Sequence, residues 1–271
     1  MSEWTRYYYR PEWHEFEALH ARFVDHTFSR HSHPYFVVGY IERGVQSYRY
    51  RGARHVTPAG HVFLVNADEG HTGESATSSG YVYRTMYPRP ELLRDVAHQM
   101  TGRWELPFFA EAVVSDPELS ARLTAFHRAL ADPASAMAVE WRLLDALAHL
   151  IAHHTSAHSR GRTIADQRPA VRLAREYIDA HCSSNLTLAT LAATVGLSAF
   201  HLERAFEREV GVPPHVYLEC ARHRRARSLL DAGLPIADVA VAAGYADQSH
   251  FTRRFKRLSG LTPAQYVRAR R

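Results

Sequence analysis

Two short segments near the C-terminus carry side chains that can bind base edges and phosphates. Segment 198–218 (SAFHLERAFEREVGVPPHVYL) recurs 49 residues later as 247–267 (DQSHFTRRFKRLSGLTPAQYV), so that Arg204 matches Arg253. Arginine and glutamine form bidentate hydrogen bonds with guanine and adenine, whereas serine, histidine and lysine more often bind phosphates. The repeat therefore predicts two helices that read double-stranded DNA.

The apolar residues of each copy indicate which side of its helix faces outward. Leu202 and Phe206 in the first copy, like Phe251 and Phe255 in the second, recur at the spacing of one buried helix face. For any single outward residue, a solvated helix face is the alternative; the repetition argues against it for the two helices together. The residues predicted to bind DNA are Phe200, His201, Glu203, Arg204, Arg208, Gln248, Ser249, His250, Arg253, Arg254 and Lys256.

The repeat extends upstream into a shorter helix and a glycine turn. Leu188 matches Ile236 and Gly196 matches Gly244, at a spacing of 48 residues. A short helix, a glycine turn that needs positive φ, and a longer basic helix make a helix-turn-helix, whose second helix enters the major groove. We therefore expect two such units in one chain.

Charge is distributed unevenly along the chain. Residues 169–271 hold 15 Lys and Arg against 9 Asp and Glu, whereas the other residues hold 18 against 19. A basic region attached to a near-neutral body is typical of a nucleic-acid-binding domain joined to a domain of another kind.

Length and composition place the chain among ordinary globular proteins. Its 271 residues suffice for two domains, no apolar run approaches 18 residues, and the N-terminus has no apolar signal-peptide core. Two isolated cysteines make neither a disulfide framework nor a cysteine metal site. We expect a reduced, cytoplasmic protein with no membrane partner.

The N-terminal half changes from strand to helix patterns. From about 28 to 88, short β-branched and aromatic runs are punctuated by glycines, which is typical of a sandwich or barrel. Helices are predicted over 117–130, capped by Asp116, and over 134–154. Segment 7–13 is either an arm over the barrel or its first edge strand. The helix at 134–154 carries an apolar stripe that either packs on the barrel or forms a dimer seam: Trp141, Leu144, Leu147, Ala148 and Ile151.

Composition also suggests the domain boundaries. A polar segment with Gly161 and no large apolar cluster separates the two patterns. We expect an effector-binding and dimerisation domain at 1–156, a linker at 157–168 and a DNA-binding domain at 169–271.

The second repeat resembles a known family of transcription regulators. The pair Gly244-Tyr245, the triplet 249–251 (Ser-His-Phe) and the run from Gly260 to Tyr266 fit the C-terminal signature of the AraC/XylS family. The resemblance implies one DNA-binding module with two recognition helices about one turn of DNA apart. Glu203 departs from the family pattern, in which this position often carries an uncharged polar or basic reader.

A second resemblance concerns the N-terminal half. The run His31-Ser-His33-Pro34-Tyr35, followed by Gly44, Asn66 and His71, is similar to the two motifs of the cupin barrel, which many AraC-type regulators use to bind an effector. By this resemblance His31, His33 and His71 match three of four cupin metal-ligand positions. Val37 or Val38 occupies the place of the carboxylate ligand, so we expect no metal and no cofactor; a metal, if bound, would use these three histidines.

The predicted strands suggest which residues line an effector pocket. At a period of two, Tyr35 and the odd-numbered residues up to Ile41 share a face with His31 and His33. An aromatic pocket with Arg43 at a nearby turn would suit a small polar or carboxylated metabolite; the alternative is that the tyrosines only fill the barrel. The predicted effector-binding residues are His31, His33, Tyr35, Arg43, His71, Tyr83 and Thr85.

Together these features predict an α+β protein with a cupin-like N-terminal β-barrel, following helices, and an all-α C-terminal domain with two helix-turn-helix motifs. We expect a transcription regulator modulated by a small molecule, without enzymatic activity. Its expected partners are double-stranded DNA, the effector, RNA polymerase and a second copy of the chain. The alternatives are a metal-dependent cupin enzyme fused to a DNA-binding module and a constitutive DNA binder whose barrel only dimerises.

Overall fold

The computed structural model describes residues 2–13, 15–131, 136–156 and 168–270. The chain divides into two compact units. The first comprises 1–27, 34–68 and 73–160, and the second combines 28–33 and 69–72 with 161–271. Except for Arg168, the linker predicted at 157–168 lies outside the described residues.

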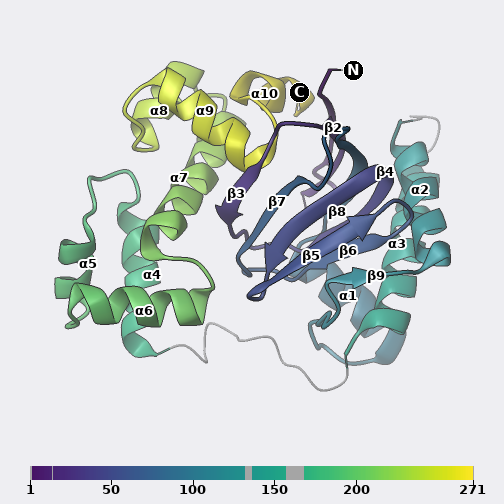
Figure 1. Cartoon of the computed structure of the whole chain (residues 1–271), viewed down its shortest axis with the longest axis horizontal. Coiled ribbons are helices and arrows are strands. Elements are labelled where there is room, and N and C mark those ends of the chain that lie inside the picture. Colours follow the sequence, from purple (N-terminus) through teal and green to yellow (C-terminus); the bar gives the residue numbers. More distant parts are fainter. Residues whose placement is uncertain (1, 14, 132–135, 157–167, 271) are drawn as a thin grey trace. The chain divides into compact units, whose positions relative to one another are not determined.

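The strands form one sheet with the order β1-β2-β8-β4-β6-β9, in which β5 and β7 also pair with β4, and β3 pairs with β7 (Figure 1). Their bounds are β1 (Trp4–Arg10), β2 (Phe16–Phe23), β3 (Phe28–His31), β4 (Val37–Tyr50), β5 (Ala53–Pro58), β6 (Val62–Val65), β7 (His71–Ser75), β8 (Tyr81–Tyr87) and β9 (Val113–Val114).

Helices follow the strands in the first unit and make up most of the second. The first unit holds α1 (Pro90–Thr101), α2 (Pro117–Ala131) and α3 (Ala136–His154). The second holds α4 (Pro169–His181), α5 (Leu188–Thr194), α6 (Ala199–Val210), α7 (Pro214–Asp231), α8 (Ile236–Ala242), α9 (Gln248–Ser259) and α10 (Pro263–Ala269). Among the described residues, no helix combines the length and the apolar character needed to cross a lipid bilayer.

Two strands differ from the sequence prediction. Strand β2 precedes the predicted strand region and is buried on both faces, so it lacks the alternation that marks a half-buried strand. Strand β4 is continuous where the sequence predicted two strands separated by Gly44. Gly44 has φ +78°, and a Cβ there would lie 2.2 Å from the Gly80 carbonyl oxygen, so glycine allows the strand to continue past a bulge between Ile41 and Arg43. Segment 7–13 begins inside β1, which pairs with β2, so the edge-strand alternative is confirmed.

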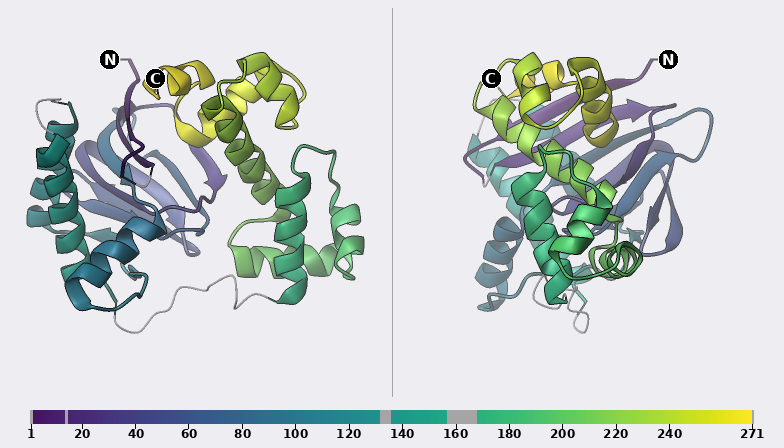
Figure 2. Two further views of the ribbon diagram at one scale, coloured as in Figure 1. Left: turned by 180° about the vertical axis from the view of Figure 1, so that it is seen from behind. Right: turned by 90° about the vertical axis from the view of Figure 1, so that its left-hand side faces the viewer.

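The two faces of the sheet have different partners. Met86 and Val38 lie on the face covered by α2 and α3, in one core with Leu147 (Figure 2). Tyr83 lies on the opposite face with Phe63, their ring centroids 6.2 Å apart. This alternation, set by the pairing of β4 with β8, positions one row of tyrosines away from the helices.

The apolar stripe of α3 packs within its own unit. Leu147 and Ile151 are buried in the sheet–helix core, and Leu144 packs against that core. Trp141 is 59% exposed and Met137 is 79% exposed, so only the first half of α3 presents large apolar side chains outward. The dimer-seam alternative is therefore wrong for Leu147 and Ile151, because their side chains already have partners.

The second unit contains the two predicted helix-turn-helix motifs, α5–α6 and α8–α9, separated by α7. Gly196 and Gly244 have φ of +68° and +85° in the two turns. Each second helix starts with a side-chain cap: the Ser198 hydroxyl accepts from the backbone N–H of His201, and the Asp247 carboxylate accepts from that of His250. The caps fix where α6 and α9 begin.

We predict that Leu147→Ala lowers the free energy of unfolding by about 2–5 kcal/mol, because a buried leucine is replaced by a cavity. Trp141→Ala is the matched control on the same helix and should change that free energy by less than about 0.5 kcal/mol. Urea unfolding measures both effects. A large loss of stability for Trp141→Ala would contradict the assignment of the buried face. A separate sedimentation experiment on the same variant tests whether Trp141 contributes to self-association.

Candidate functional site

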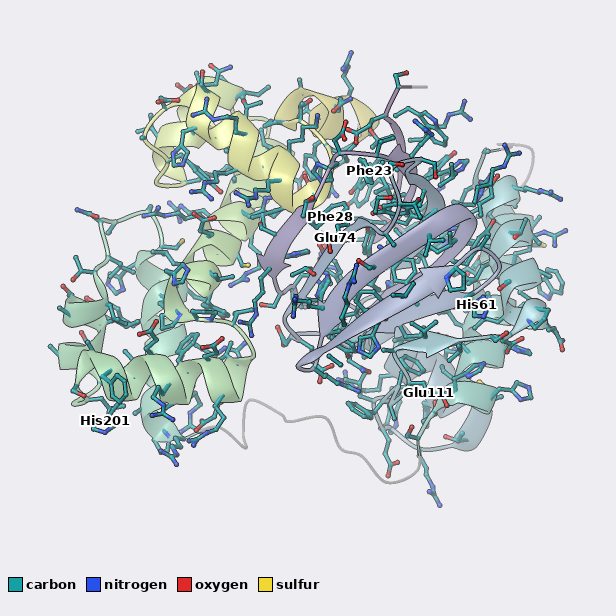
Figure 3. The ribbon with its side chains drawn as sticks, viewed as in Figure 1. Phe23, Phe28, His61, Glu74, Glu111 and His201 are labelled. Atoms are coloured by element: carbon teal, nitrogen blue, oxygen red, sulfur yellow. The ribbon has the colours of Figure 1, made fainter. Side chains whose placement is uncertain are left out.

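The outward face of α6 holds every residue predicted to bind DNA from the first copy. Phe200 is 61% exposed, and His201, Glu203, Arg204 and Arg208 are exposed beside it. Figure 3 shows His201 projecting outward near the start of the helix. Leu202 and Phe206 are buried on the opposite side, as the apolar spacing predicted.

Several of these side chains are positioned by near neighbours. The Arg204 guanidinium lies over the Phe200 ring, 5.4 Å from its centroid, and the Ser198 hydroxyl contacts His201 Nδ1 at 2.9 Å. Within the same unit, Glu207 forms an ion pair with Arg30 at 2.6 Å. The phenyl ring stiffens Arg204 in the orientation that faces solvent, which reduces the entropy lost when it binds a base or a phosphate.

The outward face of α9 divides into exposed and anchored residues. Gln248, Ser249, Arg253 and Lys256 are exposed, and all four were predicted to bind DNA. His250 and Arg254 were predicted with them, but both are half-buried.

The half-buried pair, His250 and Arg254, is linked to α7 by polar contacts. The Arg254 Nε donates to His250 Nε2 at 3.3 Å, and its Nη1 lies 3.3 Å from Glu219 Oε2. The sequence pattern could not reveal this, because Glu219 belongs to a different helix. These contacts suit Arg254 to position α9 on α7.

A row of hydroxyl side chains lines the sheet face that lies away from α2. Tyr83, Thr85 and Tyr87 alternate along β8 on that face. Tyr83 and Tyr87 share a hydrogen bond, and burial holds the pKa of both phenols well above the usual value. The Tyr35 ring lies 5.5 Å from the Tyr87 ring. This face brings together two predicted residues of β8 with Tyr35.

Sequence reasoning missed two residues of this face, Glu17 and Tyr87. Glu17 lies opposite Tyr87 in the β2–β8 pair and is 7% exposed, and its charge contributes to the raised pKa of the Tyr87 phenol. The only available signal was a carboxylate near the start of a short run of mixed polarity, FEALHARF. Arg43, which was predicted at a turn, is an exposed residue at the bulge of β4.

The three predicted histidines meet in the second unit. The ring centroids of His31 and His71 are 4.4 Å apart, and His33 lies 4.9 Å from His71 and 5.5 Å from His31. All three are buried, and their nearest nitrogens lie within 4.8 Å of one another. The predicted effector set thus divides, with these histidines in the second unit and Tyr35, Arg43, Tyr83 and Thr85 in the first.

Backbone carbonyls orient two of these rings. His31 Nδ1 lies 2.7 Å from the Ser29 oxygen and His71 Nδ1 lies 3.0 Å from the Glu69 oxygen, so both nitrogens donate and Nε2 is the acceptor. Burial lowers the pKa of both histidines, that of His71 to about 3, with repulsion from His31 as a further cause. The His31 and His71 rings are therefore neutral near pH 7.

A helical unit with two helix-turn-helix motifs is typical of a DNA-binding transcription regulator. Residues 14–147 match the AraC-like ligand binding domain family, and residues 191–269 match a helix-turn-helix domain family. The chain is 30% identical over 234 residues, 86% of its own length and 85% of the relative's, to an uncharacterized HTH-type transcriptional regulator, YbfI, of Bacillus subtilis (strain 168). The chain therefore belongs to the AraC family of transcription regulators.

Solved structures confirm the predicted fold class. ToxT from Vibrio cholerae, at 12% identity, aligns with a TM-score of 0.58 over 99% of both chains. ToxT with a bound unsaturated fatty acid aligns with a TM-score of 0.56 over 98% of this chain and 94% of that one. An α+β arrangement of a sheet domain with helices and a helical domain is thus shared with these proteins.

The buried histidines predict acid sensitivity. The pKa of His71 is lowered in the folded state, so the unfolded chain binds more protons below about pH 6.5 and stability falls as pH falls toward 3. Between pH 6.5 and pH 5 this one residue accounts for roughly 2 kcal/mol of the loss. His71→Gln should therefore flatten the dependence of the unfolding free energy on pH, measured by urea unfolding at both pH values. An unchanged dependence would contradict this prediction.

Proposed function

We propose that this AraC-family regulator changes its affinity for DNA when a small molecule binds the tyrosine face of the sheet. The observation that carries the proposal is the row formed by Tyr83, Thr85 and Tyr87 on the face that α2 and α3 leave uncovered, within the region that matches a ligand-binding family. A ligand that prefers one state of the protein shifts the populations of both. We propose domain boundaries at 1–156, 157–168 and 169–271.

The exposed residues of α6 and α9 support specific roles in DNA binding. We assign base edges to Arg204, Gln248 and Arg253, whose side chains form bidentate contacts. Contacts with phosphates fall to the remaining exposed polar residues His201, Arg208, Ser249 and Lys256. Glu203 is assigned to accept a hydrogen bond from the N4 amino group of cytosine. The Phe200 ring supports the Arg204 side chain, and His250 and Arg254 hold α9 in position.

The chemistry of the tyrosine face indicates the kind of effector. Phenol hydroxyls both donate and accept, and Glu17, when ionised, only accepts. Arg43 is exposed at the bulge, so the buried acidic group of this face is Glu17. We therefore propose a small polar molecule rich in hydrogen-bond donors, such as a polyol or an amine.

We propose that the cluster of His31, His33 and His71 acts without a metal, through hydrogen bonds to a ligand. Three imidazoles supply no negative charge, and burying an ion of charge +2 beside them is costly until an anionic ligand joins it. The chain then needs no cofactor and has no catalytic activity of its own. Stoichiometric metal released by His33→Ala would instead favour a metal-dependent enzyme.

We also propose that the chain forms a homodimer and contacts RNA polymerase. Exposed Met137 and Trp141 on α3 supply apolar surface for self-association. Recruitment or blocking of RNA polymerase is the ordinary consequence of a regulator bound near a promoter.

Arg204→Ala and Arg253→Ala should each weaken binding to the operator by about 1–3 kcal/mol, because each removes a bidentate base contact. The two losses should map to different halves of the operator. Leu173 is 45% exposed on α4, and Leu173→Ala serves as a control for substitution outside the two recognition helices. Titration of the full-length protein on wild-type and base-substituted operators measures these effects. Equal weakening on every sequence would show that the two arginines bind phosphates instead.

A screen of small polyols, amines and carboxylates by thermal unfolding tests the effector site. A ligand at about 100 times its Kd stabilises the protein by roughly 2.7 kcal/mol. Tyr83→Phe and Glu17→Gln should shrink that gain, whereas Val82→Ala, on the opposite face of the same strand, should leave it intact. A ligand whose effect is equal in all variants binds elsewhere.

A further inference from the structure

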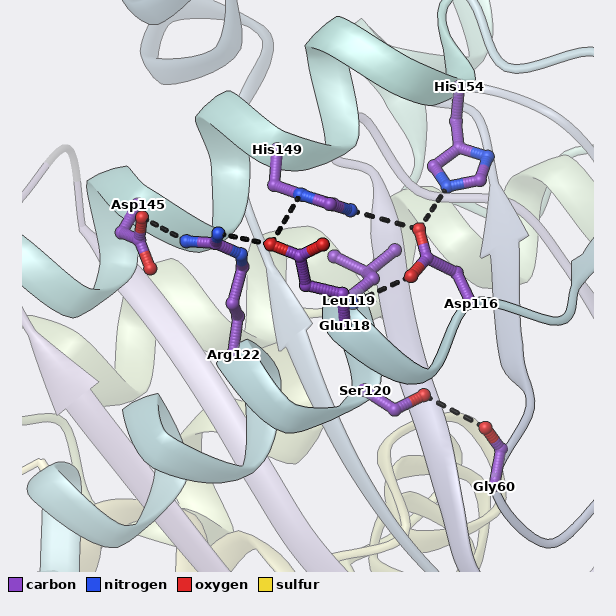
Figure 4. A network of polar contacts seen from close by, with 9 residues as sticks. All are labelled: Gly60, Asp116, Glu118, Leu119, Ser120, Arg122, Asp145, His149 and His154. Carbon is purple, nitrogen blue, oxygen red and sulfur yellow. Dashed lines mark hydrogen bonds and ion pairs between the residues drawn. The ribbon is translucent and has the colours of Figure 1, made fainter.

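A polar cluster that plays no part in the sites above joins the beginning of α2 to the end of α3. Asp116 directly precedes α2, and His149 and His154 belong to the last turns of α3. The Nε2 atoms of His149 and His154 lie 2.9 Å and 2.8 Å from the same oxygen, Asp116 Oδ2 (Figure 4). One carboxylate oxygen and two imidazole nitrogens therefore converge on a single point.

Neighbouring groups orient these three atoms. Asp116 Oδ1 accepts from the backbone N–H of Leu119 at 2.9 Å, which leaves Oδ2 to face the imidazoles. His149 Nδ1 lies 3.8 Å from Glu118 Oε1, and Arg122 in turn holds Glu118. As the side chains stand, both Nε2 atoms donate to Asp116 Oδ2. A metal ion would take the Nε2 lone pairs, so each ring would then carry its proton on Nδ1, which in His149 lies near the Glu118 carboxylate.

The local charge also favours a cation. Both histidines lie at the C-terminal end of α3, where the helix dipole is negative. The three side chains are 8%, 14% and 16% exposed, so the cluster is sheltered and still reachable from solvent.

The donor set specifies the class of ion. Two imidazoles and one carboxylate suit zinc and similar transition metals, whereas magnesium and calcium prefer oxygen ligands throughout. Ligand atoms around tetrahedral zinc lie about 3.3 Å apart. The two distances to Asp116 are about half an ångström shorter than that, and the three ligand atoms all lie within 4.8 Å of one another, so side-chain shifts would admit the ion.

We propose that Asp116, His149 and His154 bind a zinc-class divalent metal ion, with a fourth position open to water. The ion would hold the end of α3 against the beginning of α2. The residues just after α3 are fixed as well, since the Ser156 N–H donates to the Phe108 carbonyl at 3.0 Å. The site therefore stabilises the C-terminal end of the sheet domain.

Equilibrium dialysis of the full-length protein against zinc tests the proposal. The protein is prepared without a histidine tag and stripped with a chelator, and bound zinc is measured by atomic emission. We expect one equivalent in the wild type and at least a hundredfold weaker binding in His154→Gln and in Asp116→Asn, because each removes a ligand. Asparagine still accepts from the Leu119 N–H, so Asp116→Asn keeps the helix cap.

Two control variants separate this site from other histidines, and a third variant tests the orientation of His149. His153→Gln changes the exposed neighbour of His154, and the double variant His31→Gln/His71→Gln removes the other histidine cluster. Both should retain the zinc equivalent, and Glu118→Gln should weaken binding about tenfold through the orientation of His149. No zinc in the wild type, equal loss in His153→Gln, or loss only in His31→Gln/His71→Gln would each overturn the proposal.

Discussion

Two pairs of buried apolar residues, one on α6 and one on α9, determine which face of each helix is exposed. Leu202 with Phe206, and Phe251 with Phe255, are fully buried four residues apart on α6 and α9. Burying one face of a helix fixes the opposite face, so these contacts decide that Arg204 points outward. Each large side chain gains about 1.5–3 kcal/mol from burial, which no exposed polar contact on the same helix matches.

In the sheet domain, too, burial of one face fixes the other, but here the side chains change face at every residue. Alternate residues of β8 face α2 or the tyrosine row, and the pairing of β4 with β8 holds that alternation in register. A one-residue slip would place Met86 among the tyrosines and Tyr83 against the helices. The register shifts by one residue at the bulge between Ile41 and Arg43, and Gly44 just beyond it lets β4 continue along β8.

The sequence predicted the helical unit well because its information is local and repeated. In each copy, the capping residue, the turn glycine and the regularly spaced apolar residues lie within about 20 residues of one another. The same pattern in both copies supports the assignment of each. The outward helix faces followed directly, but the inward turn of Arg254 did not, since it depends on Glu219 of another helix.

The sheet domain was harder to predict because its partners are distant in sequence. Strand β2 escaped detection since burial on both faces removes alternation, and Glu17 went unnoticed with it. The cap formed by Asp116 was predicted and is confirmed. Asp116 also contacts His149 and His154, which lie 33 and 38 residues away. These contacts depend on the packing of α2 against α3, which no short sequence motif indicates.

We propose that α6 and α9 of one chain read two segments of DNA. The most direct test is a base-by-base substitution scan of an operator with the full-length protein at fixed salt. We expect two blocks of sensitive base pairs in the major groove, centred about one helical turn apart. A single block, or uniform sensitivity across the operator, would contradict it.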